Sequence, residues 1–257
     1  MGLRESKGNM YNHKLPDIEY LKCLYYDKKL SGTDIAKKYN VTPGAVFIKF
    51  RRYGIKRRSL SDAQALKANH IELSSGMIEF IDGLLLGDGC VSCPTQSKKS
   101  ACYSHTDKHV KYLTWLAMKL LKYNIITGTI APHFNNTSHL KTKYYREFLK
   151  IRIRWYPDGK KKVPLDIKIT PIVLLNWYIG DGSFRSGKNE RVILCMMYDE
   201  KGKELLSSKL SDLKIENTVS KSGIYIRANS RKIFFNYIID KNNIPKCYEY
   251  KFPKEYL

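Results

Sequence analysis

The sequence has 257 residues, 43% of them hydrophobic, and its 46 Lys and Arg against 24 Asp and Glu give a net charge of +22 at pH 7. This composition excludes a disordered chain and favours a polyanionic partner, nucleic acid above all, bound with strong salt dependence. A membrane partner is not expected, because no apolar run reaches the ~20 residues that span a bilayer and the N-terminus MGLRESKGNM lacks a signal peptide's apolar core.

The first sixty residues have the pattern of a small helical DNA-binding module. Helices are predicted near residues 17–28, 33–39 and 43–53. Ser31 or Thr33 is expected to cap the second helix, Thr42 with Pro43 to start the third, and Gly54 to end it. Because only Asn40 and Val41 separate the last two helices, the segment fits a helix-turn-helix with the third helix as its recognition helix.

Basic residues cluster on this third helix and just after it. We predict DNA contacts, mainly to phosphates, from Lys49, Arg51, Arg52, Arg57 and Arg58. The alternative interpretation is a small helical bundle with a solvated basic face.

A polar segment, residues 61–74, is predicted to link this module to the rest of the chain. Beyond it, the apolar helical run FIDGLLLGDG ends on Asp88 and Gly89. A carboxylate at a helix C-terminus is repelled by about 0.3 to 1 kcal/mol, so local stability does not explain Asp88. Gly89 is expected to close the helix in the left-handed conformation.

The same pattern returns as PIVLLNWYIGDGSF, residues 171–184, with Asp181 lying 93 residues after Asp88. Each Asp-Gly is followed some seventy residues later by a Lys-x-Pro, at Lys162 and at Lys251. In between, helical and strand-like runs alternate in both halves, so the sequence predicts a duplicated α+β unit with basic sheets. Strands are expected at residues 151–156 and 223–228.

Long polar side chains on these strands are predicted to contact DNA, because alternate residues of a strand share one face. The contacts predicted from these strands are Arg152, Arg154, Tyr225 and Arg227, and Arg185 is a further predicted DNA contact.

Small residues would let the two apolar helices pack side by side about a pseudo-twofold axis. Gly83 and Gly87 share one helical face, and Gly180 repeats the inner position. Asp88 and Asp181 would then meet at one end of the interface and bind divalent cations, for which Mg²⁺ suits oxygen ligands best. Lys162 and Lys251 could stabilise charge on the reacting phosphate or assist proton transfer.

Six cysteines are too few and too scattered for a disulfide framework in a chain of this size. Cys90, Cys93, Cys102 and His105 have a spacing that could hold zinc. Residues three apart on a strand face opposite sides, so we favour small core or strand cysteines over a zinc site.

The runs IDGLLLGDG and LLNWYIGDG resemble the two motifs of a single-chain LAGLIDADG homing endonuclease, and residues 155–184 resemble the intron-encoded branch. The resemblance covers about residues 75–257. It implies two αββαββα units, residues 75–168 and 169–257, with the motif helices at the centre and two saddle-shaped antiparallel sheets in the DNA major groove. The 1–60 module lies outside this pattern.

The resemblance also implies function. It places the metal-binding acidic residues at Asp88 and Asp181, with the preceding Gly87 and Gly180 at the metal site. The basic active-site residues fall on Lys162 and Lys251, with Lys161 a near alternative. The implied activity is site-specific, double-strand cleavage of a long DNA target by a monomer with Mg²⁺, for which Mn²⁺ substitutes. Asn176 stands where the motif has its first Gly, so we expect looser packing there or a hydrogen bond across the interface.

Two other functions stay open. One is a non-cleaving DNA-binding regulator of the same fold, although Asp88, Asp181 and the lysines are all intact. The other is an RNA maturase that aids splicing of its own intron. Expected locations are the bacterial cytoplasm or nucleoid, a phage-infected cell, or an organelle matrix.

Overall fold

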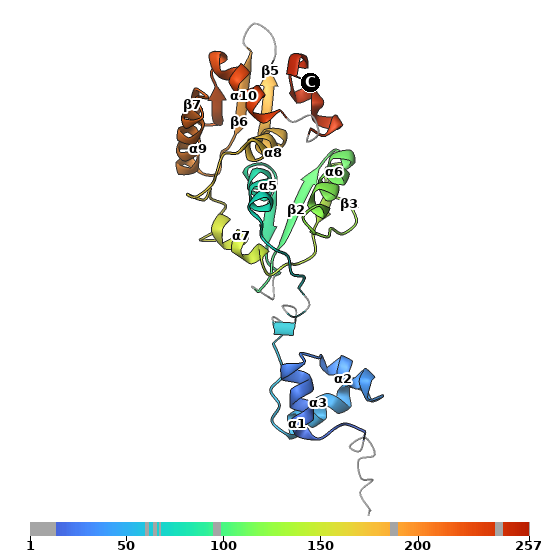
Figure 1. The fold of residues 1–257 in the computed structure, drawn as a ribbon. Coiled ribbons are helices and arrows are strands. Elements are labelled where there is room, and N and C mark those ends of the chain that lie inside the picture. The colour runs from blue at the N-terminus through green and yellow to red at the C-terminus, as the bar shows by residue number, and fades with distance from the viewer. Residues whose placement is uncertain are drawn as a thin grey trace, which may run out of the picture. The chain divides into compact units, whose positions relative to one another are not determined.

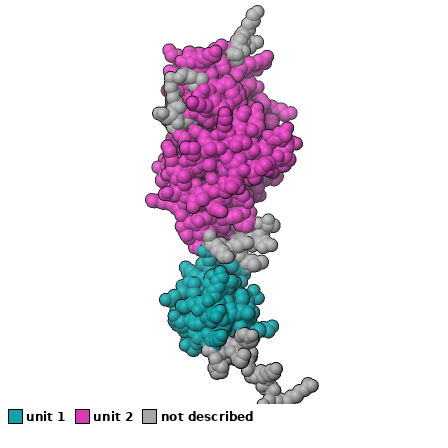
Figure 2. Space-filling model, turned by 90° about the vertical axis from the view of Figure 1, so that its right-hand side faces the viewer, with its two compact units in different colours: residues 1–67 teal, residues 68–257 magenta. Residues whose placement is uncertain are grey.

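The computed structural model describes residues 14–59, 62–63, 66, 68–94, 99–185, 190–239 and 244–256. The chain divides into two compact units, residues 1–67 and 68–257 (Figure 2). Each unit has its own cluster of buried apolar side chains. None of the helices in the described residues is long and apolar enough to cross a membrane.

The first unit is built from short helices around a small core. They are α1 (Ile18–Lys22), continued by a π-helical turn η1 (Cys23–Asp27), then α2 (Gly32–Lys38) and α3 (Pro43–Arg52). Ser31 caps α2 and Thr42 caps α3, with Pro43 at the first helical position. Gly54 follows α3 at a φ of +66°, as a left-handed stop requires. The helices expected from the sequence are therefore confirmed.

The second unit contains two halves with the same order of elements (Figure 1). The first half consists of α5 (Ser75–Leu86), β1 (Cys90–Ser92), β2 (Cys102–Asp107), α6 (Val110–Leu121), β3 (Ala131–Pro132), β4 (Ser138–Lys141) and α7 (Phe148–Trp155). The second consists of α8 (Pro171–Asp181), β5 (Gly182–Arg185), β6 (Arg191–Cys195), α9 (Glu200–Asp212), β7 (Asn217–Ser220), β8 (Gly223–Ile226) and α10 (Arg231–Ile238).

Each half forms a four-stranded antiparallel sheet with the same topology. The strand orders are β1-β2-β4-β3 and β5-β6-β8-β7. The second half ends in 3-10 turns: η2 (Ala228–Ser230) precedes α10, and η4 (Lys246–Lys251) and η5 (Lys254–Tyr256) follow it. The predicted duplication of an αββαββα unit is thus confirmed.

One predicted strand is wrong. Residues 148–155 form α7 and not a strand, because Phe148, Ile151 and Trp155 are buried at helical spacing. The alternation of charged and apolar residues in IRIRWY is locally compatible with a strand. Together with Phe148, which precedes this run, Ile151 and Trp155 form one apolar face of a helix. Arg152 and Arg154 consequently do not lie on a sheet.

The segment just before α5 packs on the first half. The backbone of Asn69 bridges to the strand-like segment at Tyr145, and its N–H donates to the Tyr144 carbonyl at 2.9 Å. The N–H of Ile71 donates to the Glu147 carboxylate. Residues 69–71 thus belong to the second unit although they lie in the predicted linker.

Helices α5 and α8 pack against each other at the centre of the second unit (Figure 1). A Cβ added to Gly83 would lie 2.6 Å from the Val173 carbonyl oxygen and 2.8 Å from the Cβ of Asn176. Gly83 therefore makes the room that Asn176 needs. Asn176 donates to the Ile172 carbonyl in its own helix at 2.9 Å, so the expected hydrogen bond across the interface is not formed.

Gly83→Ala should destabilise the second unit by about 2 to 3 kcal/mol, because the new methyl group meets backbone atoms that cannot move aside cheaply. Gly76→Ala in the same helix is the matched control. Its Cβ meets nothing closer than 3.9 Å, and alanine favours a helix by ~0.5 to 1 kcal/mol. Denaturant unfolding followed by Trp fluorescence measures both, since all three Trp residues lie in this unit. Equal stability of the two variants would contradict close packing at Gly83.

Candidate active site at the paired helix ends

The C-terminal ends of α5 and α8 touch through their backbones. A Cβ added to Gly87 would lie 3.2 Å from the Cα of Gly180, and the reverse distance is also 3.2 Å. Asp88 and Asp181 follow these glycines directly, so the contact brings the two carboxylates to one end of the interface. Asp88 is exposed and Asp181 is partly buried.

The turn after α5 differs from the expected left-handed stop. The N–H of Gly89 donates to the Leu84 carbonyl at 2.9 Å, but the positive-φ glycines among the described residues do not include Gly89. Glycine is needed for space instead, because a Cβ there would lie 2.6 Å from the Leu84 carbonyl oxygen and 2.8 Å from the Tyr103 ring.

A lysine ammonium caps each of these helix ends. The Nζ of Lys161 donates to the carbonyls of Gly87 at 2.8 Å and Gly89 at 3.1 Å. In the second half, the Nζ of Lys251 donates to the carbonyls of Ile179 at 2.6 Å and Gly180 at 3.0 Å. Both cations face the negative ends of the helix dipoles.

The structure does not bring Lys162 to this site. Its Nζ pairs with Asp158 at 2.8 Å on the surface, where both side chains are about half exposed. The neighbouring Lys161 takes the place beside Asp88 that the sequence assigned first to Lys162. Lys251 lies where it was expected.

Burial shifts the pKa values of Asp181, Lys161 and Lys251. The pKa of Asp181 rises to about 6, first because burial disfavours its charge and second because of the nearby charge of Asp88. Burial also lowers the pKa of Lys161 to about 8, although both carboxylates oppose this shift. Burial lowers the pKa of Lys251 in the same way. The two halves thus meet in a cluster of two aspartates and two lysines, in which Asp88 is exposed and the other three side chains are partly buried.

The oxygens at this junction fit a hard divalent cation. The two carboxylates repel each other, and the backbone carbonyls of Gly87 and Gly180 already accept hydrogen bonds from cations. No group of three or more His, Cys, Asp or Glu suited to a metal occurs in the described ranges. This donor set suits Mg²⁺, which commonly takes one or two protein carboxylates and completes its shell with water and substrate phosphate.

Two of the four residues considered for zinc have other side-chain partners. The Tyr103 hydroxyl and Nδ1 of His105 lie 2.8 Å apart, and the sulfur of Cys102 lies against Ser92. Cys90 is exposed and pairs in register with Ser104 on β2. Within the part of the chain that the structure describes, these four residues form no zinc-type cluster.

A buried ion pair between α5 and α7 was not predicted from the sequence. The buried carboxylate of Asp82 accepts from Arg154 at 2.6 Å and from the indole of Trp155 at 2.8 Å. Arg154 also donates to Asp166 at 2.8 Å. Arg154, predicted to contact DNA, therefore anchors α7 to the motif helix. A polar residue in the otherwise apolar run of α5 was the signal in the sequence.

A second buried polar cluster joins the two halves. The Tyr248 hydroxyl of η4 donates to Asp107 at the end of β2. The Tyr248 ring packs edge-on against Tyr112 and His109 of the first half. These contacts fix the segment that carries Lys251. The spacing of aromatic residues gave no sequence signal for this cluster.

Three of the remaining predicted DNA contacts lie on or just beyond the second sheet, and Arg152 lies in α7. In the second sheet, Tyr225 pairs with Ile193 and Thr218, and its side chain is partly exposed while Ile224 and Ile226 are buried. Arg227, just beyond β8, and Arg185 of β5 are exposed. Arg152 is partly buried, with its guanidinium stacked on the Tyr156 ring at 3.8 Å from the centroid. Two further basic side chains lie on the sheets, the partly exposed Arg191 of β6 and the exposed Lys141 of β4.

The basic residues predicted to contact DNA in the first unit fall into two groups, those that bond backbone carbonyls within the unit and those that are exposed. Lys49, predicted to contact DNA, is instead buried and donates to the carbonyls of Leu15 and Pro16. Arg58 donates to the carbonyls of Leu30 and Tyr25 and stacks on the Tyr25 ring. Arg51, Arg52 and Arg57 are exposed.

Asp181→Asn should stabilise the metal-free protein at pH 7 by about 1 to 3 kcal/mol and lose this advantage as the pH falls toward 4. A raised pKa means that the folded state holds its proton more tightly, so stability declines as pH rises from about 4 to about 6. Because asparagine does not titrate, the stability of Asp181→Asn lacks this decline. Unfolding in chelator at several pH values measures the difference, with the exposed Asp212→Asn as control. A difference that grew at low pH would contradict the burial of Asp181.

Comparisons with known proteins place this arrangement in a family. The model of the LAGLIDADG DNA endonuclease family matches residues 78–235. An uncharacterised protein of Methanocaldococcus jannaschii is 29% identical over 173 residues, which are 64% of this chain and 65% of that protein. RecA of Mycobacterium leprae is 31% identical over 121 residues, 45% of this chain and 17% of RecA. The chain spans less than two thirds of the length of either relative.

Among solved structures, the homing endonuclease I-WcaI bound to its DNA recognition sequence has the same fold. It superimposes with a TM-score of 0.59 over 79% of this chain and 96% of that one, at 18% identity. The family match takes in both sheets and nearly all of both central helices. The chain therefore belongs to the LAGLIDADG DNA endonuclease family.

Proposed function

We propose that this protein is a site-specific endonuclease that cuts both strands of a long DNA target with divalent metal ions. The observation that carries the proposal is the meeting of Asp88 and Asp181 at the touching ends of α5 and α8. Family membership supports a DNA endonuclease in general, and the double-strand activity and the roles of individual residues are our proposal.

Asp88 and Asp181, with the carbonyls of Gly87 and Gly180, would hold Mg²⁺ or Mn²⁺. The bound metal would polarise the scissile phosphate and activate the attacking water. The repulsion between the two carboxylates favours a cation between them, which supports this assignment.

We assign the basic roles to Lys161 and Lys251. Each ammonium bonds a backbone carbonyl at a helix end that carries one of the two carboxylates, and from there it could stabilise negative charge that develops on the phosphate. With a pKa of about 8, Lys161 can also exchange a proton near neutral pH.

Both sheets and the N-terminal unit would bind the duplex. Exposed or partly exposed side chains of the second sheet, together with Lys141 of the first, offer contacts to phosphates and bases. The contacts proposed for the second sheet are Arg185, Arg191, Tyr225 and Arg227. In the N-terminal unit, Arg51, Arg52 and Arg57 remain as proposed contacts, whereas Lys49 and Arg58 serve the fold.

A plasmid library with random inserts provides the first test. Incubation of the full chain with the library in Mg²⁺, recovery of linear molecules and sequencing of their ends would reveal a common site. Absence of sequence-specific cutting at any Mg²⁺ or Mn²⁺ concentration would contradict the proposal.

On that site, Asp88→Asn and Asp181→Asn should each nearly abolish double-strand cleavage while binding in low metal persists. Each change keeps the side-chain shape but removes a charge that the cation needs. Strand-resolved products and a gel-shift assay measure both effects. Near-parental cutting of both strands by the two variants would exclude these carboxylates as the metal site.

Lys161→Met and Lys162→Met form a matched pair of adjacent lysines. Lys161→Met should reduce the cleavage rate by at least about 100-fold, the size of effect typical for a lost electrostatic or acid–base group. Lys162→Met should change it less than about threefold, because its Nζ pairs only with the surface residue Asp158 in the structure. Single-turnover cleavage rates at saturating enzyme compare the two variants. A larger rate loss in Lys162→Met than in Lys161→Met would assign the active-site role to Lys162 instead.

Removal of residues 1–67 should leave a folded, metal-dependent core that binds DNA more weakly, because the two units have separate apolar cores. Footprinting should show lost protection at one end of the site. Equal affinity with an unchanged footprint would remove the N-terminal unit from the DNA interface.

A further inference from the structure

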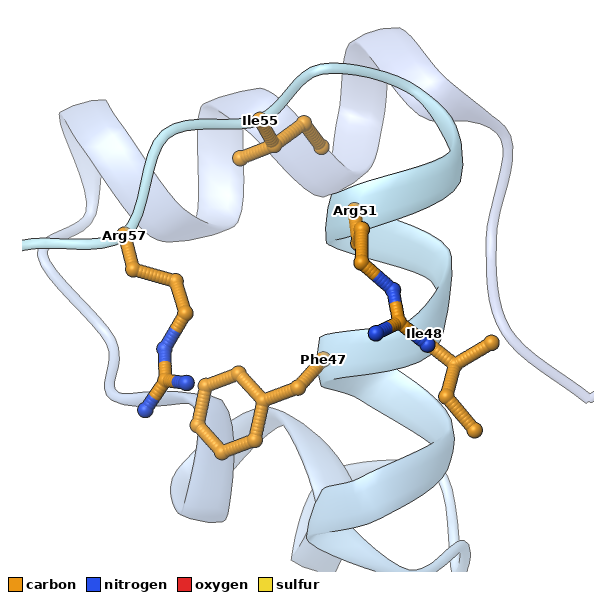
Figure 3. A pocket seen from close by; sticks show the side chains of 5 residues that line it. All are labelled: Phe47, Ile48, Arg51, Ile55 and Arg57. Carbon is orange, nitrogen blue, oxygen red and sulfur yellow. The ribbon is translucent and has the colours of Figure 1, made fainter.

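A hollow of about 440 Å³ opens on the surface of the N-terminal unit. Figure 3 shows its lining: Phe47, Ile48 and Arg51 from α3, and Ile55 and Arg57 from the segment that follows. Apolar side chains form most of the wall, together with the guanidinium groups of Arg51 and Arg57. The volume falls in the range of about 300 to 1,000 Å³ typical of sites for small organic groups.

The aromatic wall of this hollow is held in place. A Cβ added to Gly32 of α2 would lie 2.6 Å from the Phe47 ring, so glycine allows the two helices to approach there. The guanidinium carbon of Arg57 lies 4.2 Å from the ring centroid, and the Phe50 ring meets Phe47 edge-on at 5.9 Å. A wall that is already ordered loses little entropy when a ligand binds.

Ile48 is the exposed part of the same surface. Its side chain is 50% exposed on α3, one turn from Arg51. The surrounding unit is strongly basic, since residues 14–59 contain twelve Lys and Arg against four Asp and Glu. An apolar side chain set among cations suits a polyanion that also presents an apolar group.

The lining side chains also decide which group fits. Guanidinium groups only donate hydrogen bonds, so the ligand must offer acceptors beside its apolar part. In the major groove, thymine presents a methyl group next to the O4 acceptor, and guanine presents two acceptors. Cytosine presents only an amino donor, and adenine presents one acceptor beside an amino donor, so thymine alone combines an acceptor with an apolar methyl group.

We infer that this hollow is a base-reading site that takes the C5-methyl group of a thymine in the major groove of duplex DNA, with Arg51 and Arg57 meeting acceptor atoms beside it. The inference deepens the proposed function and rests on it. It assigns base specificity to a face of α3 and gives Ile48 a binding role.

The test uses the full chain and a single chemical change in the DNA. Duplexes bound in Ca²⁺ are first selected from a randomised library, and each thymine of the selected site is then replaced singly by uracil, which lacks only the methyl group. For the parent protein, uracil at one position should weaken binding about fourfold, the value of one buried methyl group. With Ile48→Ala, uracil at that position should cause almost no further loss.

Two variants serve as controls. Ile48→Val keeps most of the apolar contact and should retain most of the thymine preference. Tyr20→Ala removes an exposed apolar side chain of α1 outside the hollow and should retain all of it. Circular dichroism verifies that the variants keep their helices.

The outcomes separate this inference from the proposed function. If the protein binds and cleaves DNA but the ratio of thymine-duplex to uracil-duplex affinity is the same for the parent, Ile48→Ala and Ile48→Val, the inference is overturned and the proposed function is not. A selection that enriches no duplex would overturn the proposed function and the inference with it. Loss of the thymine preference in Ile48→Ala alone would support both.

Discussion

The backbone contact between Gly87 and Gly180 is the constraint on which the second unit depends. Helices can approach this closely only where neither carries a side chain, and the approach forces two carboxylates and two negative helix ends into one place. Burial raises the pKa of Asp181 to about 6, and the nearby charge of Asp88 adds to this rise, so the charged form of Asp181 is disfavoured here. Lys161 and Lys251 offset part of that cost by bonding the exposed carbonyls.

The sequence was sufficient to predict the duplication, the central helices and their acidic ends, because these features recur at a fixed distance and in a fixed order. Prediction from the sequence failed where one local pattern is compatible with both a strand and a helix. IRIRWY alternates like a strand, and only the burial of Phe148 with Ile151 and Trp155 decides for a helix. With α7 helical, the turn after it brings Lys161 to the site and leaves Lys162 on the surface.

Other errors arose from partners distant in the sequence. Lys49 lies within a basic helix, but its ammonium is taken by two carbonyls more than thirty residues earlier in the chain. Arg154 is similarly drawn inward by Asp82, which lies 72 residues away. Composition indicates how many cations the protein carries, whereas tertiary packing determines which of them remain available to a polyanion.

The contact between Gly83 and Asn176 has a consequence for the history of the chain. A pair of first halves would face glycine with glycine and leave a void, while a pair of second halves would bring two asparagines into a space that fits one. Asp82 and its partner Arg154 likewise have no counterpart in the second half, where Leu175 holds the matching position. The two central helices therefore complement each other better than either would complement a copy of itself, which favours pairing of the two halves within one chain.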